Sequence, residues 1–223
     1  MLFICWLWRG HGFWKPVARY HRLHVARLAS MLARHGGHRL LCVHDAESDD
    51  LPDGVRGVYM PAPVRALPDY LPKLWAWSPA FHEMVGERFA SIDLDVVITG
   101  DLGPLLTTGD RLRIWNHAQG ELYNSSLFVL EPGAHHDVWM RMTTARMAAA
   151  RARAGYWTGD QSWIAHVIGP GAATFGERDG VIQYRPKLHR AQMPAGMLAG
   201  FMCGPYEPFG EGRESEWVRL NYV

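Results

Sequence analysis

The chain has 223 residues, of which 48% are hydrophobic and 20% are charged, so it has an ordinary globular composition and is long enough to bury a sizeable core. A formal net charge of +1 gives no electrostatic support for a nucleic-acid partner or an anionic membrane surface. Three cysteines without a CxxC pair argue against a disulfide framework and a zinc ribbon, and they fit the reducing cytoplasm. We expect one domain over residues 1–223, with no membrane span and no bound nucleic acid.

The first part of the chain predicts a β-α-β unit. The apolar run MLFICWLW, residues 1–8, is too short to span a membrane and is typical of a buried strand. Residues 17–35 carry apolar side chains at helical spacing, and the glycine pair that follows ends this helix. The segment HRLLCVHD, residues 38–45, predicts a second strand that ends in Asp45. Strands joined in this way are parallel and leave their carboxyl ends open to a ligand.

Proline punctuates the next part of the chain. The acidic segment 46–54 predicts a turn, and no regular element is expected between Met60 and Lys73. A helix is predicted over residues 73–86, with an interruption at Pro79. This helix leads directly into the next predicted strand.

Two aspartates interrupt that strand, which is otherwise apolar over residues 91–98. Because side chains alternate along a strand, Asp93 and Asp95 would share one face, while their apolar neighbours share the other. Two adjacent carboxylates repel each other unless a cation lies between them, and hard oxygen ligands suit Mg²⁺ or Mn²⁺. The pair therefore predicts a metal site, with an ordinary acidic strand end as the alternative.

The second half contributes one strand and two helices. Residues 121–133 predict a strand with a polar beginning, and the arginine-rich segment 134–154 predicts an exposed helix. A further helix is predicted over residues 159–169, where Asp160 is suited to cap the first turn. None of the twelve histidines lies in a ligand pattern such as HExxH, so solvated helix faces are expected for them.

Taken together, the order of these segments resembles bacterial glycosyltransferases of the GT-A fold, similar to family 8. The motifs that carry the resemblance are PKLWAWSP, SIDLDVVITGDLGPLL, YNSSLFVLEPG, GDQSWIAHV and the final EWVRLNY. The resemblance covers most of the chain. It implies an α/β fold in which a GT-A-like mixed, mostly parallel sheet is flanked by helices.

The resemblance also implies a reaction. The donor would be a nucleotide-diphospho-sugar, a UDP-hexose first of all, and the acceptor a glycan or a lipid-linked sugar. Mn²⁺ or Mg²⁺ held by Asp93 and Asp95 would stabilise the leaving diphosphate, and anomeric configuration would be retained. Asp160 and Gln161 would act near the anomeric carbon as catalytic residues. The donor-binding residues implied are Trp8, Arg9, Gly10, Asp45, Lys73, Asp93, Leu94, Asp95, Asn124 and Ser125.

One segment departs from the family pattern. Family members commonly supply a third metal ligand from a C-terminal His-Gly-x-x-Lys-Pro segment, whereas this chain has GFMCGPYEP at residues 200–208. The candidates for the third ligand are therefore Cys203, Met202 or water.

Two other functions fit the same residues. The SIDLDVV segment also resembles the motif of haloacid-dehalogenase-like phosphatases, although in those proteins the motif belongs to the first strand of the core. The missing histidine is equally compatible with a nucleotide-sugar-binding protein that has lost transfer activity.

Overall fold

The computed structural model describes residues 1–8, 20–45, 51–116, 122–143, 146, 159–202, 208 and 214–223. Its centre is a seven-stranded sheet with the order β3-β2-β1-β4-β7-β6-β8. These strands are β1 (Leu2–Leu7), β2 (Arg39–His44), β3 (Arg56–Tyr59), β4 (Phe89–Ile92), β6 (Leu112–Trp115), β7 (Asn124–Leu130) and β8 (Ala173–Phe175). Only β7 runs antiparallel to its neighbours, so the sheet is mixed and mostly parallel.

The central strand β1 is buried along its whole length, as the sequence predicts. Phe3, Cys5 and Leu7 pack into a core on one face of the sheet. The alternating residues Leu2, Ile4 and Trp6 pack into a second core on the other face. Both faces of the sheet are therefore covered, which is why this strand has no polar residue.

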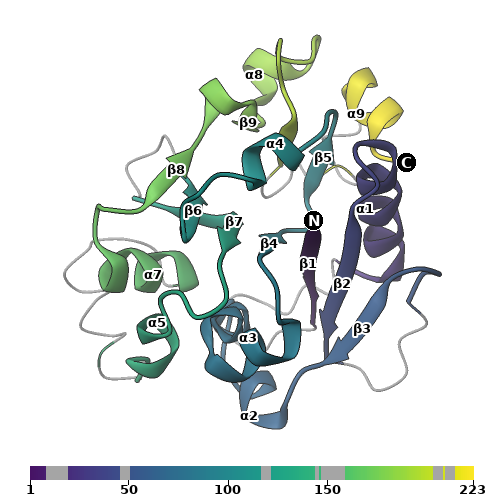
Figure 1. Ribbon diagram of the computed structural model, residues 1–223. Helices are drawn as coiled ribbons and strands as arrows, with labels where there is room; N and C mark the ends of the chain where they lie inside the picture. The colour runs from purple at the N-terminus through teal and green to yellow at the C-terminus, as the bar shows by residue number, and fades with distance from the viewer. Residues whose placement is uncertain are drawn as a thin grey trace.

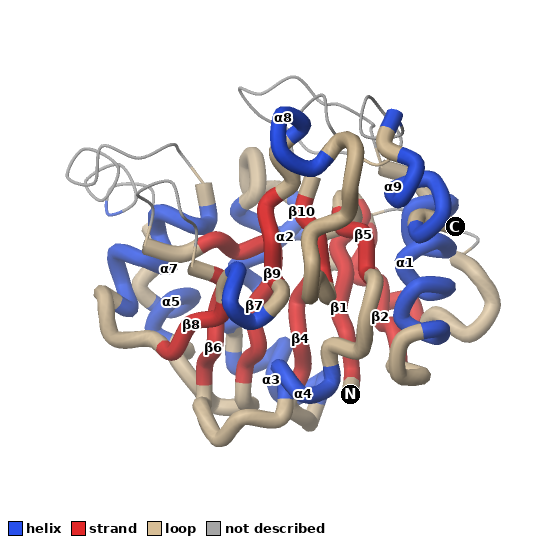
Figure 2. The backbone as a smooth tube through the Cα atoms, turned by 90° about the horizontal axis from the view of Figure 1, so that it is seen from above, coloured by secondary structure: helices blue, strands red, loops and turns tan. Residues whose placement is uncertain are grey.

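One face of the sheet is covered by helices and by a second, smaller sheet. The helices are α1 (Arg22–Arg34), α4 (Gly103–Leu106) and α9 (Glu216–Asn221), and the three-stranded sheet has the order β5-β10-β9. Its strands are β5 (Val96–Ile98), β9 (Val181–Gln183) and β10 (Ala199–Phe201). In both Figure 1 and Figure 2, α9 lies beside α1. Arg34 joins the two helices by donating a hydrogen bond from Nη2 to the carbonyl oxygen of Asn221 at 2.6 Å.

The other face is covered by short helices that surround a buried aromatic cluster. They are α2 (Ala62–Arg65), the 3₁₀ helix η1 (Leu71–Trp77), α3 (Pro79–Val85), α5 (Asp137–Met140) and α7 (Asp160–Ile168). The remaining elements are η2 (Glu177–Asp179) and α8 (Pro186–His189), which lies near β9 at the top of Figure 1. No helix among the described residues is long and apolar enough to cross a membrane.

The proline-punctuated segment differs from its sequence prediction. It was expected to be irregular up to Lys73, but it contains α2, and η1 begins two residues before that lysine. Pro63, Pro72 and Pro79 occupy the first turns of α2, η1 and α3, where the missing N–H group costs no hydrogen bond. The predicted interruption at Pro79 is confirmed, because η1 ends and α3 begins there.

Three further predictions need correction. The edge strand β3 follows the acidic segment and was not predicted from the sequence. Of the helix expected over residues 134–154, the structure describes one turn, α5, which is followed by a turn at Arg141, and a helical residue at Arg146; most of the rest lies outside the described residues. His24 is buried rather than solvated. Its Nδ1 accepts a hydrogen bond from the backbone N–H of His21, and this bond completes the N-terminal cap of α1.

A hydrogen-bonded histidine pair, of which His82 is buried, joins α3 to the chain before α5. His82 donates from Nε2 to the carbonyl oxygen of Ala76 at 2.8 Å, and its Nδ1 accepts from the backbone N–H of Gly133 at 2.8 Å and from Nε2 of His136 at 2.7 Å. A second proton on the ring would occupy Nδ1, which would remove the hydrogen bond from the Gly133 N–H and require Nε2 of His136 to become an acceptor. Burial, together with the charge of His136, lowers the pKa of His82 to about 4.

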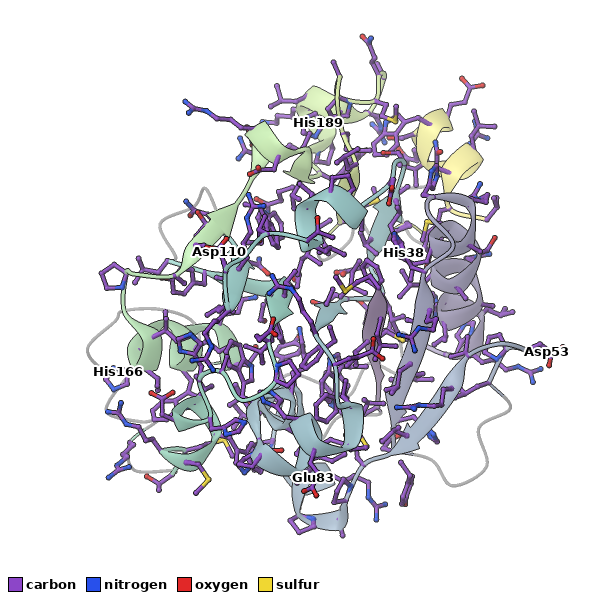
Figure 3. All side chains as sticks on the ribbon, in the orientation of Figure 1. His38, Asp53, Glu83, Asp110, His166 and His189 are labelled. Carbon is purple, nitrogen blue, oxygen red and sulfur yellow. The ribbon has the colours of Figure 1, made fainter. Side chains whose placement is uncertain are left out.

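This arrangement predicts acid sensitivity. In the unfolded chain the histidine binds a proton below pH ~6.5, whereas in the folded protein His82 stays neutral until about pH 4. The stability that neutral His82 contributes is therefore fully present above pH ~6.5 and is lost as the pH falls toward 4. The free energy of unfolding, measured with urea, should fall between pH 7 and pH 4.5 in both proteins. The fall should be smaller in His82→Gln than in wild type by roughly 2 kcal/mol. His166→Gln, at an exposed position of α7 (Figure 3), is the control and should keep the wild-type pH dependence. Identical pH dependence in His82→Gln and wild type would contradict the prediction.

Candidate active site

Asp93 and Asp95 lie between two sheets rather than within one strand. The strand β4 ends at Ile92, and β5 begins at Val96 in the smaller sheet, so the predicted continuous strand is wrong. Asp93 makes the last backbone hydrogen bond to β7, from its N–H to the carbonyl oxygen of Ser126 at 3.0 Å, and the chain then leaves the main sheet. Leu94 is buried while both aspartates are only partly buried, and the shared face of the two aspartates stays a prediction.

A buried lysine connects this segment to two others. Lys73, only 4% exposed, donates from Nζ to Oδ1 of Asp93 at 2.6 Å and to the carbonyl oxygen of Ser125 at 3.2 Å. The same Nζ lies 3.8 Å from Oδ2 of Asp160, which is 3% exposed. The 3₁₀ helix η1, the end of β4, the beginning of β7 and the beginning of α7 therefore meet at one ammonium group.

The charges of Lys73, Asp93 and Asp160 offset one another because the three groups lie close together in a largely buried cluster. Burial by itself lowers the pKa of Lys73, but the negative charges of Asp93 and Asp160 outweigh it, and the pKa lies above its ordinary value. Burial raises the pKa of Asp160, although Lys73 opposes the shift. Oδ2 of Asp160 is buried and has no hydrogen-bond partner among the described residues. The ion pair with Lys73, at 3.8 Å, is the interaction that the structure gives this carboxylate oxygen.

Asp160 is not the N-cap of α7, so the capping interpretation is wrong. Gly159 occupies the N-cap position, and Asp160 is the first helical residue, with its side chain directed to Lys73. Its neighbour Gln161 donates from Nε2 to Oδ1 of Asn124 at 3.3 Å. That oxygen also accepts the backbone N–H of Ser126 at 2.8 Å, which fixes the amide of Asn124 at the beginning of β7. Gln161, a predicted catalytic residue, is thus in direct contact with Asn124, a predicted donor-binding residue.

The other predicted residues lie at the same edge of the sheet or outside the described residues. Trp8 and Asp45 follow β1 and β2, and these strands are parallel to each other, as β1 is to β4, so their carboxyl ends share the edge at which Asp93 lies. Arg9, Gly10 and Cys203 lie outside the described residues. Met202 is fully buried, and its backbone N–H donates to the carbonyl oxygen of Asp95 at 2.9 Å. The C-terminal segment therefore contacts the aspartate segment at Met202, and the third metal ligand stays a prediction.

Asp93 and Asp95 are the side chains of this site that could bind a divalent cation together with a substrate. Among the described residues, no group of three histidine, cysteine or acidic side chains could hold a metal ion. His38, His166 and His189 lie in three separate parts of the molecule (Figure 3). Mg²⁺ is commonly bound by one or two carboxylates together with substrate phosphates, and Asp93 and Asp95 are the carboxylates of this segment that could take that part.

Sequence reasoning missed Tyr70, which is 53% exposed and whose ring lies next to Gly159, the residue before Asp160. Its position depends on Asp69, which has a left-handed backbone with φ of 53° and whose carbonyl oxygen accepts a hydrogen bond from the indole of Trp8 at 3.3 Å. No local pattern in the sequence indicates this turn.

The two sheets, their topology and the covering helices define the GT-A fold of glycosyltransferases. At the level of sequence, no family model and no curated protein matches the chain. Among solved structures, the galactosyltransferase LgtC in complex with donor and acceptor sugar analogues is 12% identical, with a TM-score of 0.59 over 100% of this chain and 97% of LgtC. The glycosyltransferase GlyE of Streptococcus pneumoniae TIGR4 in its apo form is 10% identical, with a TM-score of 0.66 over 100% of this chain and 60% of GlyE. The expected fold class is confirmed by these similarities.

Proposed function

We propose that the protein transfers a sugar from a nucleotide-diphosphate donor, a UDP-hexose first of all, to a glycan or lipid-linked acceptor. The observation that carries this proposal is the contact of Lys73 with Asp93, Ser125 and Asp160 at the carboxyl edge of the sheet. A fold shared with glycosyltransferases supports the same reaction class. The phosphatase alternative is less well supported, because the Asp-Leu-Asp segment follows the fourth strand of the chain and not the first.

The residues divide into two groups around the donor. Asp93 and Asp95 would hold Mn²⁺ or Mg²⁺, which neutralises charge on the leaving diphosphate. Lys73 is buried against Asp93, so its main role is to position that carboxylate, and its contact with phosphate is indirect. Asp160 would stabilise positive charge at the anomeric carbon, and Gln161 and Asn124 would orient sugar hydroxyls. Retention of configuration stays a prediction.

The test is a donor screen with the purified protein. Each nucleotide sugar is incubated with Mn²⁺ or Mg²⁺ without acceptor, and the release of nucleoside diphosphate is measured. Hydrolysis of one donor supports the transferase. Tight binding of a nucleotide sugar without hydrolysis or transfer supports the binding-protein alternative, and hydrolysis of simple phosphate monoesters supports the phosphatase.

Loss of either aspartate should weaken metal-dependent donor binding. Asp93→Asn and Asp95→Asn should each reduce it about 100-fold, or about 2.7 kcal/mol, because each removes one of the two anionic ligands. Calorimetric titration of donor with and without Mn²⁺ measures the effect. Asp110→Asn is the matched control and should bind like wild type, because Asp110 is exposed (Figure 3) and precedes the end of β6 that pairs with Leu130 rather than with Asn124. A wild-type metal response in both variants would show that the pair is not a metal site.

A further inference from the structure

Tyr70 is a large exposed aromatic residue at the edge of the candidate active site. It is the N-cap residue of η1, and its carbonyl oxygen accepts the backbone N–H of Lys73 at 3.2 Å. A Cβ atom on Gly159 would lie 4.0 Å from Cδ2 of the ring, so the ring lies next to the residue that precedes Asp160. The ring is therefore placed between the 3₁₀ helix that carries the buried lysine and the helix that carries the buried carboxylate.

The turn that presents this ring is held in place from two sides. Asp69 has a positive φ, which is unfavourable for a residue other than glycine and persists only where the surroundings require it. The indole of Trp8 binds the carbonyl oxygen of Asp69, and the N–H of Leu71 donates to the carbonyl oxygen of Pro68 at 3.2 Å. The backbone of the turn is therefore held, and a half-exposed aromatic ring on it has only two side-chain torsions to order when it provides an apolar face for a ligand.

The charges around the ring indicate what kind of ligand fits. Burial, together with the negative charges of Asp93, Asp160 and Asp95, raises the pKa of Tyr70, so the phenol stays protonated and its O–H can donate a hydrogen bond. Lys73 offsets one of these three carboxylates, a divalent cation would offset the other two, and the bound donor diphosphate would add negative charge again, so a second anion is disfavoured beside the ring. Hydroxyl groups, by contrast, can donate hydrogen bonds to carboxylate oxygens. A pyranose ring has both required features, since its C–H face is apolar and its edge carries hydroxyls. The nucleoside is expected elsewhere, at the ends of β1 and β2.

We propose that the ring of Tyr70 is the stacking face for the acceptor, and that the acceptor presents an uncharged pyranose there. This inference rests on the proposed function and extends it to the class of acceptor.

The experiment measures the binding of methyl β-glucopyranoside, methyl β-galactopyranoside and the anionic methyl β-glucuronide by saturation-transfer NMR, with UDP and Mg²⁺ present. Wild type and Tyr70→Phe should bind at least one neutral glycoside, and Tyr70→Ala should bind it about fivefold more weakly. Leu220→Ala removes an apolar side chain of similar exposure from α9 and should bind like wild type. Thermal unfolding of each variant checks that it is folded.

Three results would overturn the inference: equal binding by Tyr70→Ala and wild type, preference for the glucuronide, or no binding of either neutral glycoside by wild type. Weaker binding of the UDP-sugar by Tyr70→Ala, with glycoside binding unchanged, would place the ring against the donor and also overturn it. Hydrolysis of a UDP-sugar by wild type is measured separately. Its absence would contradict the proposed function, whereas glycoside binding alone tests the role of Tyr70.

Discussion

Replacing Asp160 with asparagine should lower turnover about 1000-fold, because the loss of charge is felt mainly in the transition state. Asparagine has nearly the same shape, so the contacts of the α7 N-terminus are preserved. The substitution removes the charge of the whole carboxylate, whose Oδ2 is buried, 3.8 Å from the Lys73 ammonium, and without a hydrogen-bond partner among the described residues. Donor affinity should change much less than turnover.

Initial rates of donor hydrolysis and calorimetric donor binding together test this prediction. Asp137→Asn is the matched control, because Asp137 is likewise the first residue of a helix, α5, but is exposed. The control should retain wild-type turnover. Because burial raises the pKa of Asp160, wild-type turnover should also fall with acidification at a higher pH than an exposed carboxyl group would give. Equal losses of donor affinity and turnover would assign Asp160 to donor binding instead.

Replacing Lys73 with methionine should reduce the free energy of unfolding by about 3–5 kcal/mol. Methionine fills similar space, but it leaves the carboxylates of Asp93 and Asp160 close together without their shared cation. Urea unfolding at pH 7 measures the loss. Lys187→Met, at an exposed position of α8, is the control and should differ from wild type by less than about 0.5 kcal/mol.

A double variant separates the charge effect from packing. Lys73→Met combined with Asp93→Asn removes one of the two unpaired charges, so it should recover part of the stability lost in Lys73→Met. It also provides a folded protein for measurement if the single variant does not fold. A single variant as stable as wild type would contradict the prediction. A double variant that is less stable than the single variant would also contradict it, because the loss would then come from packing.

The sequence by itself determined the elements that depend on local pattern. The buried first strand, α1, β7 and α7 follow from apolar periodicity and its end signals, which act over a few residues. The order of the motifs was sufficient to predict the fold class. It also identified Asp93, Asn124 and Asp160 as residues of one site, and the structure places all three at or near one buried lysine.

Only the tertiary structure decided how these residues interact. Lys73 is 20 residues from Asp93 and 52 from Ser125 in the chain, so no local pattern could indicate that its ammonium group is buried between them. The strand predicted through Asp93 and Asp95 is divided, because β4 pairs in one sheet and β5 in another. Tyr70 is presented by a turn whose left-handed residue is held by a tryptophan 61 positions away. Hydrophobic periodicity indicates which side chains are buried. The partners of a buried charge depend instead on which distant segments of the chain the fold brings together.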